Sequence, residues 1–376
     1  MTYLRSLAAL AIVLTANPMV PGSADLEAQS PWGAGTGVAY ERYQFGESDA
    51  VGIESLSLLT VPFSARSTFF GNATLEVSGG YARGSLVRID GTESSISGIT
   101  DTEVSLGVAL GDGLATINAI VLVPTGQETM AADEIEVAGA IASDLLPFGI
   151  SHWGSGGGVG LGTTLTTTAG DVGLGITAGY FVAGEFDPVE TSQLTAFRPG
   201  NILSVQLGVD RNIGTSGKAT LQLGLQRFGD DTFEGRNLYR SGNRYQAMGS
   251  YAFAVGPRAS AIVYAGGEHR SSGAALLDVT FDAASQNLAL FGGGMRVPFG
   301  RTTLLPSLAA RILSTSDGVG QGFVTTAGLS AEIGTGPITL LPNVKLRLGR
   351  VLVREGSESG ITGVDLGIAI RFGGGE

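Results

Sequence analysis

Residues 363–372 read GVDLGIAIRF, and this stretch close to the C-terminus decides the fold. Large apolar side chains occupy every second position, namely Val364, Leu366, Ile368, Ile370 and Phe372. The positions between them are polar or small, namely Asp365, Gly367, Ala369 and Arg371. Because successive side chains of a strand point to opposite sides, the pattern predicts a strand with one apolar and one polar face.

The same alternation recurs along the chain from residue 35, in segments of about 11 to 17 residues. Thr102–Leu110 and Lys218–Phe228 are clear examples, with leucine or valine at alternating positions. The predicted strands are 35–47, 51–64, 68–83, 98–110, 114–124, 150–168, 170–183, 199–213, 217–231, 241–255, 257–271, 285–299, 301–315, 321–334, 337–353 and 361–372. This makes about sixteen strands, with fourteen or twelve as the alternative counts.

Tight turns and longer connections alternate between these segments. The tight turns fall at 111–113, 169–171, 214–217, 256–257, 300–301 and 334–337. The longer loops are 84–97, 125–149, 184–198, 232–240, 272–284, 316–320 and 354–360, whereas the first connection, 48–50, is short where a longer loop is expected. This rhythm is typical of an up-and-down barrel in an outer membrane, where short turns face the periplasm and longer loops face outside.

The composition narrows the class of protein. Only 15% of the residues are charged and the net charge is −12, which argues against a nucleic-acid partner. The absence of cysteine excludes disulfides and thiolate metal sites. The chain has 60 glycines but a mean hydropathy of +0.25, and disordered chains lack this apolar content. A glycine-rich, apolar and weakly charged chain suits a sheet with one face toward lipid.

The first residues have the pattern of a secretory signal peptide. In MTYLRSLAALAIVLTA, Arg5 precedes an apolar run, and small residues at plausible cleavage sites follow, after Ala24 or after Ala28. Beyond this segment no stretch is long and apolar enough for a helical membrane span. We therefore expect export, with residues 1–28 as the signal peptide and residues 29–376 as one barrel domain.

Together these patterns predict an all-β protein, a single transmembrane antiparallel up-and-down β-barrel in the outer membrane of a Gram-negative-type bacterium. A closed barrel satisfies every backbone hydrogen-bonding group in lipid. A soluble β-sandwich would need more large aromatic side chains in its core, and a β-helix would show a fixed repeat length, which the sequence lacks. The last strand, ending at Phe372, is similar to the C-terminal strand of outer-membrane barrels, through which the barrel-assembly machinery is expected to bind, although GGGE follows it.

If the apolar faces meet lipid, the opposite faces line the interior of the barrel. The expected lumen-facing residues are Glu76, Glu103, Gln206, Asp210, Gln222, Gln226, Arg244, Gln246, Lys345, Arg347, Asp365 and Arg371. Acids concentrate in the early strands and bases in the later ones. Such residues either pair across a wet interior or produce a transverse field that orients a polar or amphiphilic solute.

The sequence contains no pattern typical of catalysis or of a cofactor. His152 and His269 are far apart in sequence and offer no metal-ligand spacing, and no GxSxG nucleophile motif occurs. Trp153 is expected to anchor the lipid–water interface beside His152, and His269 is expected among charged residues at the outer rim. We therefore expect no enzyme, no cofactor and no metal.

One interval departs from the strand pattern. Residues 123–149 read VPTGQETMAADEIEVAGAIASDLLPFG, with apolar residues at helical spacing. The interval forms the third outward loop, between the fifth and sixth predicted strands. Acids stand where the N-terminus of a helix favours them, and the apolar side chains need cover. We expect a short helix here, with loop 125–149 forming a pore constriction. The expected constriction residues are Asp133, Glu134, Glu136, Ile141, Leu145 and Phe148.

Two motifs beside this loop resemble those of one protein family. Ser97-Gly98-Ile99-Thr100-Asp101-Thr102 opens the fourth predicted strand, and Val123-Pro124-Thr125-Gly126 ends the fifth. They are similar to the Ser-Gly-x-Gly-Asp and Leu-Pro-Thr-Gly motifs of outer-membrane transporters associated with the phenol meta-cleavage pathway, with Thr100 and Val123 as departures. The resemblance, over residues 95–185, implies a transporter of hydrophobic compounds that behaves like porins and fatty-acid channels. The first predicted strand begins soon after the signal peptide, which argues against the long plug of fatty-acid channels.

We therefore expect a passive channel or transporter for small solutes, hydrophobic or aromatic ones included. Its expected partners are outer-membrane lipid, lipopolysaccharide, the barrel-assembly machinery and a small-molecule solute, without nucleic acid. The alternative is a closed structural or adhesive barrel whose loops bind outside partners, and the third hypothesis is an outer-membrane hydrolase.

Overall fold

The computed structural model describes residues 32–46, 52–111, 113–190, 195–276, 283–354 and 357–373. The predicted signal peptide, 1–28, and the short first connection, 48–50, lie outside the described residues. The described part of the chain forms one large antiparallel sheet, one small sheet and one helix, α3 (Ala132–Ile141). No helix within it is long and apolar enough to cross a membrane.

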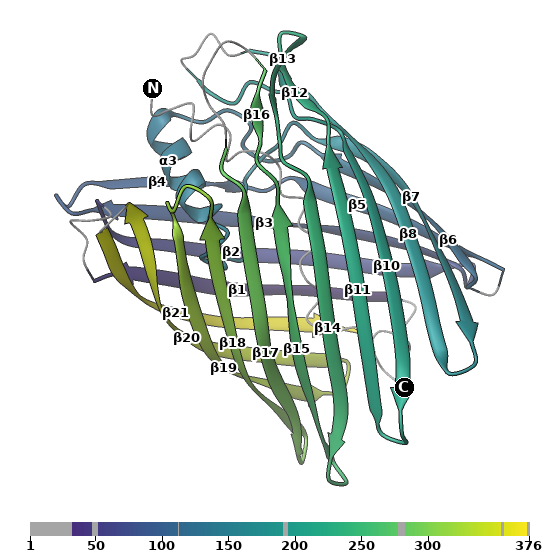
Figure 1. Ribbon diagram of the computed structural model, residues 1–376. Helices are drawn as coiled ribbons and strands as arrows, with labels where there is room; N and C mark the ends of the chain where they lie inside the picture. The colour runs from purple at the N-terminus through teal and green to yellow at the C-terminus, as the bar shows by residue number, and fades with distance from the viewer. Residues whose placement is uncertain are drawn as a thin grey trace.

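The strands of the large sheet follow one another around a closed barrel (Figure 1). They are β1 (Trp32–Phe45), β2 (Ile53–Phe69), β3 (Ala73–Arg88), β4 (Glu93–Ile99), β5 (Thr102–Leu110), β6 (Ala115–Val123), β7 (Gly158–Ala169), β8 (Val172–Ala183), β10 (Ile202–Ile213), β11 (Gly217–Phe228), β14 (Arg244–Val255), β15 (Ala259–Arg270), β17 (Gln286–Phe299), β18 (Thr302–Thr315), β19 (Gln321–Thr335), β20 (Ile338–Arg354) and β21 (Ser357–Phe372). β1 pairs with β21 to close the ring, with Ala34 opposite Phe372. β4 and β5 pair with successive parts of β3 and share one place, so the described barrel has sixteen strands. The predicted fold class and strand number are confirmed.

Several predicted boundaries are wrong, among them the loop 354–360, because β20 runs to Arg354 and β21 begins at Ser357. Two others bear on the inward loop. The connection 84–97 is not a long loop, because β3 continues to Arg88 and β4 begins at Glu93. β4 reads ESSISGI, and its serines hide the alternation that marks the other strands. The strand predicted from residue 150 begins only at Gly158, and the residues before it belong to the third outward loop.

Three outward connections build the small sheet. It consists of β9 (Phe197–Arg198), β12 (Asp230–Phe233), β13 (Arg236–Arg240) and β16 (Ala274–Ala275), in the order β16-β13-β12-β9. Figure 1 shows β12, β13 and β16 at the same end of the barrel as α3, whereas the hairpin turns of β10–β11 and β14–β15 lie at the other end. The longer connections are thus gathered at one end.

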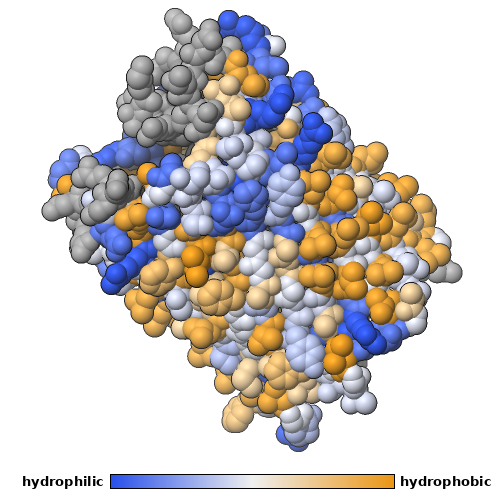
Figure 2. Space-filling model, viewed as in Figure 1, coloured by the Kyte–Doolittle hydropathy of each residue, from blue (hydrophilic) through white to orange (hydrophobic). Residues whose placement is uncertain are grey.

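The outward face of the barrel is apolar. Leu207, Leu221 and Leu223 are 44 to 46% exposed although they sit in the middle of strands. Exposed tyrosines, Tyr180 and Tyr245, lie near the loop ends of their strands, and Trp32, Phe299 and Phe372 lie near the turn ends. Figure 2 shows apolar side chains spread over the strands and hydrophilic ones gathered toward the end that carries β12 and β13. Lipid requires such an apolar surface, flanked by aromatic side chains at both interfaces.

Candidate pore constriction

The helix α3 is built by local sequence. Asp133 and Glu134 lie in its first turn, where acidic side chains are favourable. The N–H of Ala131 donates to Glu134 Oε2 at 2.9 Å, and Gln127 Nε2 donates to the same oxygen at 2.8 Å. The first bond satisfies the backbone N–H of the residue that precedes the helix, and the second holds the Glu134 carboxylate in place.

One face of α3 lies against the inner wall of the barrel. Ile135, Val137 and Ile141 are at most 6% exposed and share a cluster with apolar side chains on the inward faces of β2, β3 and β4. The wall members of this cluster are Tyr43, Leu56, Leu58, Ala82, Leu86, Ile96, Leu313, Val324 and Ile361. Burial of each large apolar side chain contributes about 1.5 to 3 kcal/mol, so the packing holds the helix against the wall.

Gly84 on β3 lets the helix approach closely. A Cβ atom there would lie 2.5 Å from Ile141 Cδ1, 3.0 Å from Trp153 Cη2 and 3.2 Å from Val137 Cγ1. Real Cβ contacts are almost always longer, so a side chain at this position would force Ile141, Trp153 and Val137 to shift.

The two ends of the inward loop meet at the break between β4 and β5. Asp101 Oδ1 accepts from the N–H of Gly126 at 3.0 Å, and its Oδ2 accepts from Ser155 Oγ at 2.6 Å. The N–H of Asp101 donates to the carbonyl of Trp153 at 3.0 Å. Asp101 is 6% exposed, so its carboxylate holds both ends of the loop inside the protein. We call this group of contacts the Asp101 clamp.

The Asp101 clamp explains the two sequence motifs. Thr125 Oγ1 donates to the carbonyl of Thr100 at 2.9 Å and lies 2.9 Å from Thr102 Oγ1, so the motif at 97–102 binds the motif at 123–126. Gly126 has no room for a side chain, because a Cβ atom there would clash with Trp153, and Asp101 Oδ1 would lie 2.8 Å away. The motifs therefore position the loop.

Trp153 does not anchor the lipid interface, and that prediction is wrong. It is fully buried in the cluster beneath α3, and its Nε1 donates to the carbonyl of Ala82 at 3.1 Å. The sequence places it just before a strand, where an interface tryptophan is common, but the strand begins five residues later, at Gly158. The loop therefore carries this side chain inward.

Beyond α3 the loop follows the wall across β1 and β18. Arg311 Nη1 on β18 donates to the carbonyl of Asp144 at 2.9 Å. The N–H of Gly149 donates to Glu41 Oε2 on β1 at 2.7 Å, and Phe148 meets Tyr43 edge to face with 4.9 Å between the ring centroids. The covered part of the wall thus runs from β4 through β1 and β21 to β18.

A buried ion-pair network lies in the same part of the wall. Arg347 Nη2 donates to Glu41 Oε1 at 3.0 Å and to Asp365 Oδ2 at 3.1 Å, and its Nη1 donates to Tyr43 Oη at 2.6 Å. Lys345 Nζ donates to Asp365 Oδ2 at 2.8 Å. Charges removed from water require such partners, and the network therefore fixes the wall to which the loop is bonded through Glu41.

The opposite part of the wall remains open. β10 is the eighth strand of the ring and lies across the barrel from β21. By the register, Gln206 on β10 and Gln222 on β11 face inward, away from the exposed leucines, and both are exposed. A Cβ atom at Gly208, between them on the same face, would meet nothing within 4 Å. Space for solvent therefore exists next to this wall.

The predicted constriction residues divide into three groups. Ile141 and Leu145 are buried in the loop core, and Phe148 packs on Tyr43. Glu134 caps α3, and Glu136 forms an ion pair with Arg88 at the end of β3. Asp133 is exposed in the first turn of α3.

The predicted lumen-facing residues all share the inward side of their strands with the residues described above. Lys345, Arg347 and Asp365 belong to the buried network, and Arg244 lies 3.6 Å from Glu268. Asp210 pairs with Lys218 at 3.3 Å. By register Glu76, Glu103 and Arg371 also face inward, as do Gln206, Gln222, Gln226 and Gln246.

Sequence reasoning missed Glu41, Arg311 and Asp101. Glu41 and Arg311 lie on strands that alternate like the others. A list of every second residue on the polar face of those strands would have included both as lumen-facing. Asp101 belongs to the motif at 97–102, but its role depends on a loop end 25 residues away, which no local pattern shows.

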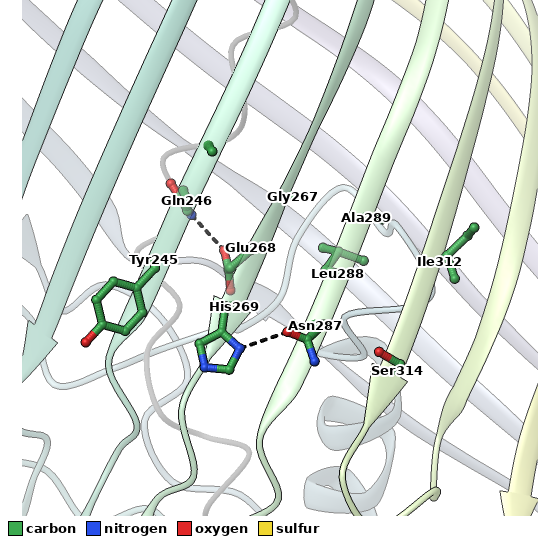
Figure 3. A pocket seen from close by; sticks show the side chains of 11 residues that line it. Tyr245, Gln246, Gly267, Glu268, His269, Asn287, Leu288, Ala289, Ile312 and Ser314 are labelled. Carbon is green, nitrogen blue, oxygen red and sulfur yellow. Dashed lines mark hydrogen bonds between the residues drawn. The ribbon is translucent and has the colours of Figure 1, made fainter.

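The two histidines lie in different environments. His152 Nδ1 is 3.1 Å from Ser151 Oγ, and burial lowers the pKa of His152. His269 Nδ1 is 2.8 Å from Asn287 Oδ1 on the outward face of the wall, beside Tyr245 (Figure 3). Within the described residues no group of three or more His, Cys, Asp or Glu is placed to hold a metal ion.

Comparisons with known proteins give no family assignment. No family model and no curated protein matches the chain. Among solved structures, Pseudomonas putida OprB at high pH matches with a TM-score of 0.49 and 10% identity, covering 91% of this chain and 94% of that one. Pseudomonas aeruginosa OccK11 (OpdR) matches with 0.46 and 12% identity over 91% and 96% of the two chains. A bacterial polysaccharide outer membrane secretin matches with 0.44 and 12% identity over 90% and 98%. Similarities of this level establish no function for this chain.

Proposed function

We propose that the protein is an outer-membrane channel through which small solutes cross passively, with loop 125–149 forming its constriction. One observation carries the proposal. The loop seats its apolar stripe on one side of the inner wall, whereas Gln206 and Gln222 on the opposite wall stay exposed. A loop held against one wall narrows a barrel without filling it. The apolar outward belt would lie in lipid, beneath lipopolysaccharide.

The alternative of a closed structural barrel requires an interior filled with interlocking side chains. The space next to Gly208 argues against such filling in this part of the wall. The family resemblance implies apolar or aromatic solutes, and that stays a prediction. The open wall itself presents amides.

A substituted-cysteine experiment tests the channel. The natural chain has no cysteine, so Gly208→Cys introduces a single thiol facing the lumen, and Leu207→Cys is the matched control facing lipid. A charged methanethiosulfonate reagent is expected to reduce single-channel conductance in planar bilayers only for Gly208→Cys. Modified Gly208→Cys with unchanged conductance, with the adduct verified by mass, would contradict the proposal.

Deletion of residues 131–146 tests the constriction. The barrel strands are closed without this segment, so the variant is expected to fold and to show a higher single-channel conductance. Equal conductance in a correctly folded deletion variant would show that the loop does not limit the pore.

A further inference from the structure

We propose that the open wall of the channel selects neutral, polyhydroxylated solutes of about monosaccharide size. This inference rests on the proposed channel function and names the solute class of the same passage. It concerns four inward glutamines on three neighbouring strands, which we call the amide face: Gln206 on β10, Gln222 and Gln226 on β11, and Gln246 on β14.

The register places these side chains on the inward face of three neighbouring strands, in positions diagonal to one another. Ser204 stands opposite Gln226, Gln206 opposite Gly224 and Gly208 opposite Gln222. On the next strand pair Gly224 stands opposite Gln246. A Cβ atom at Gly224 would lie 3.4 Å from Gln246 Oε1 and 3.9 Å from Gln206 Cγ, so these two glutamines flank the glycine. Gly208 and Gly224 leave room between these amides.

Two of these amides are free to bind a solute. Gln206 and Gln222 are exposed and have no hydrogen-bond partner within the described part of the chain. Gln246 is different, because its Nε2 donates to Glu268 Oε2 at 2.7 Å (Figure 3). An amide offers both a donor and an acceptor, which is the combination that a hydroxyl group also carries. The two free amides of Gln206 and Gln222 can therefore exchange hydrogen bonds with the hydroxyls of a passing solute.

An ion pair stands at each end of the amide face. Asp210 lies 3.3 Å from Lys218 at the turn end, and Glu268 lies 3.6 Å from Arg244 at the loop end. Hydroxyls continue the same face, with Thr220 Oγ1 and Ser250 Oγ bonded across β11 and β14. On β10, β11 and β14 the stretch between the two ion pairs thus offers no counter-charge to an ion.

The test compares solutes of equal size and different charge. Liposomes containing the full-length protein are placed in isosmotic glucose, gluconate or glucosamine, and swelling rates are divided by the KCl conductance of the same preparation. Glucose is expected to enter several-fold faster than either ion. In Gln206→Met/Gln222→Met, which keeps side-chain length but removes the amides, the ratio for glucose is expected to fall about tenfold. The matched control, Leu207→Met/Leu223→Met, changes lipid-facing positions on the same strands and should keep the wild-type ratio.

The outcomes separate the two proposals. A wild-type barrel that conducts KCl but admits glucose no faster than gluconate and glucosamine overturns the solute class and leaves the channel intact. An unchanged glucose ratio in the glutamine variant, with folding verified by heat-dependent gel migration, also overturns it. A folded barrel that neither conducts ions nor admits any solute overturns the channel itself.

Discussion

Replacing Asp101 by alanine should release the inward loop while leaving the barrel closed. The carboxylate binds the N–H of Gly126 and the hydroxyl of Ser155, which lie at the two ends of the loop. The strand break at Thr100 and Asp101 separates the clamp from the ladders of β4 and β5, each of which pairs independently with β3. The substitution therefore acts on the loop rather than on barrel closure.

The magnitude follows from the two bonds that disappear. A hydrogen bond to a charged group contributes about 1.5 to 3 kcal/mol, and removal of the acceptor leaves the buried partners of Asp101 unsatisfied. A loss of about 3 kcal/mol in docking free energy raises the ratio of undocked to docked loop roughly a hundredfold, since about 1.4 kcal/mol corresponds to a factor of ten. The apolar stripe around Ile141 and Trp153 stays buried for most of the time, so the loop should open briefly rather than remain undocked.

A glutamyl endopeptidase measures these openings directly. The loop contains Glu128, Glu134 and Glu136, after which this enzyme can cut, so the fragments produced there report on the loop. An enzyme that cuts after lysine or arginine would not serve, because neither residue occurs from residue 124 to residue 157. When opening is fast relative to cleavage, the rate follows the population of the open state. Asp101→Ala should therefore be cut at these glutamates roughly a hundredfold faster than the wild type, and its single-channel record should show added transient increases in conductance.

Two further variants make the test specific. Asp101→Asn keeps an acceptor for the N–H of Gly126 and should be cut at a rate between those of wild type and alanine variant. Asp171→Ala removes an exposed carboxylate that pairs with Arg211 at the opposite end of the barrel, and it should behave as wild type. Wild-type cleavage and conductance in a folded Asp101→Ala barrel would refute the clamp.

Two more predictions concern the helix contact and the outer sheet. Gly84→Val should push α3 off the wall and reduce the free energy of loop docking by about 1 to 3 kcal/mol. In a Trp32→Phe background, the fluorescence emission of buried Trp153 should then move to longer wavelength. The control is Gly139→Ala, where a Cβ atom meets nothing within 4 Å, and it should leave the emission unchanged. Burial raises the pKa of Asp231 from 3.8 to about 6, so its stabilisation is complete below pH 3.8 and is lost as the pH rises through about 6. Hydrogen-exchange protection factors around β9 and β12 should then be about tenfold higher at pH 5 than at pH 7.5, and Asp231→Asn should abolish this difference; an equal pH dependence in both proteins would contradict the assignment.

The barrel could be predicted from sequence because lipid imposes a simple rule on each strand. Where the outward face is apolar and the lumen is wet, as in β10, β11 and β21, side chains alternate and the turns are glycine-rich. The prediction failed at β4, whose outward and inward faces both carry serine. Its inward face meets the loop rather than water, so Ser94 and Ile96 are both buried there.

The candidate site was only partly accessible from sequence. Helical spacing and the apolar stripe of residues 131–148 predicted a short helix that needs cover, and α3 confirms the helix. The contacts of the loop with Gly84, Glu41 and Arg311 join residues that are 53 to 167 positions apart, and no local pattern encodes them. Trp153 is the clearest example of such a wrong prediction. Its neighbours in sequence indicate a membrane interface, whereas its neighbours in space form a buried apolar cluster.

The strands that receive the loop nevertheless carry a signal of their own. In a water-filled barrel the inward face is polar, yet the inward positions of β2 include Leu56 and Leu58, and the outward face of the same strand carries Leu59 and Val61. A barrel strand that is apolar on both faces cannot have water on one side and lipid on the other. Such a strand must therefore be covered from within, and in this chain loop 125–149 supplies the apolar side chains that cover it. Strands that are apolar on both faces thus indicate, from sequence, which part of the wall a loop covers. Strands that are apolar on the outward face alone indicate which part lines the passage.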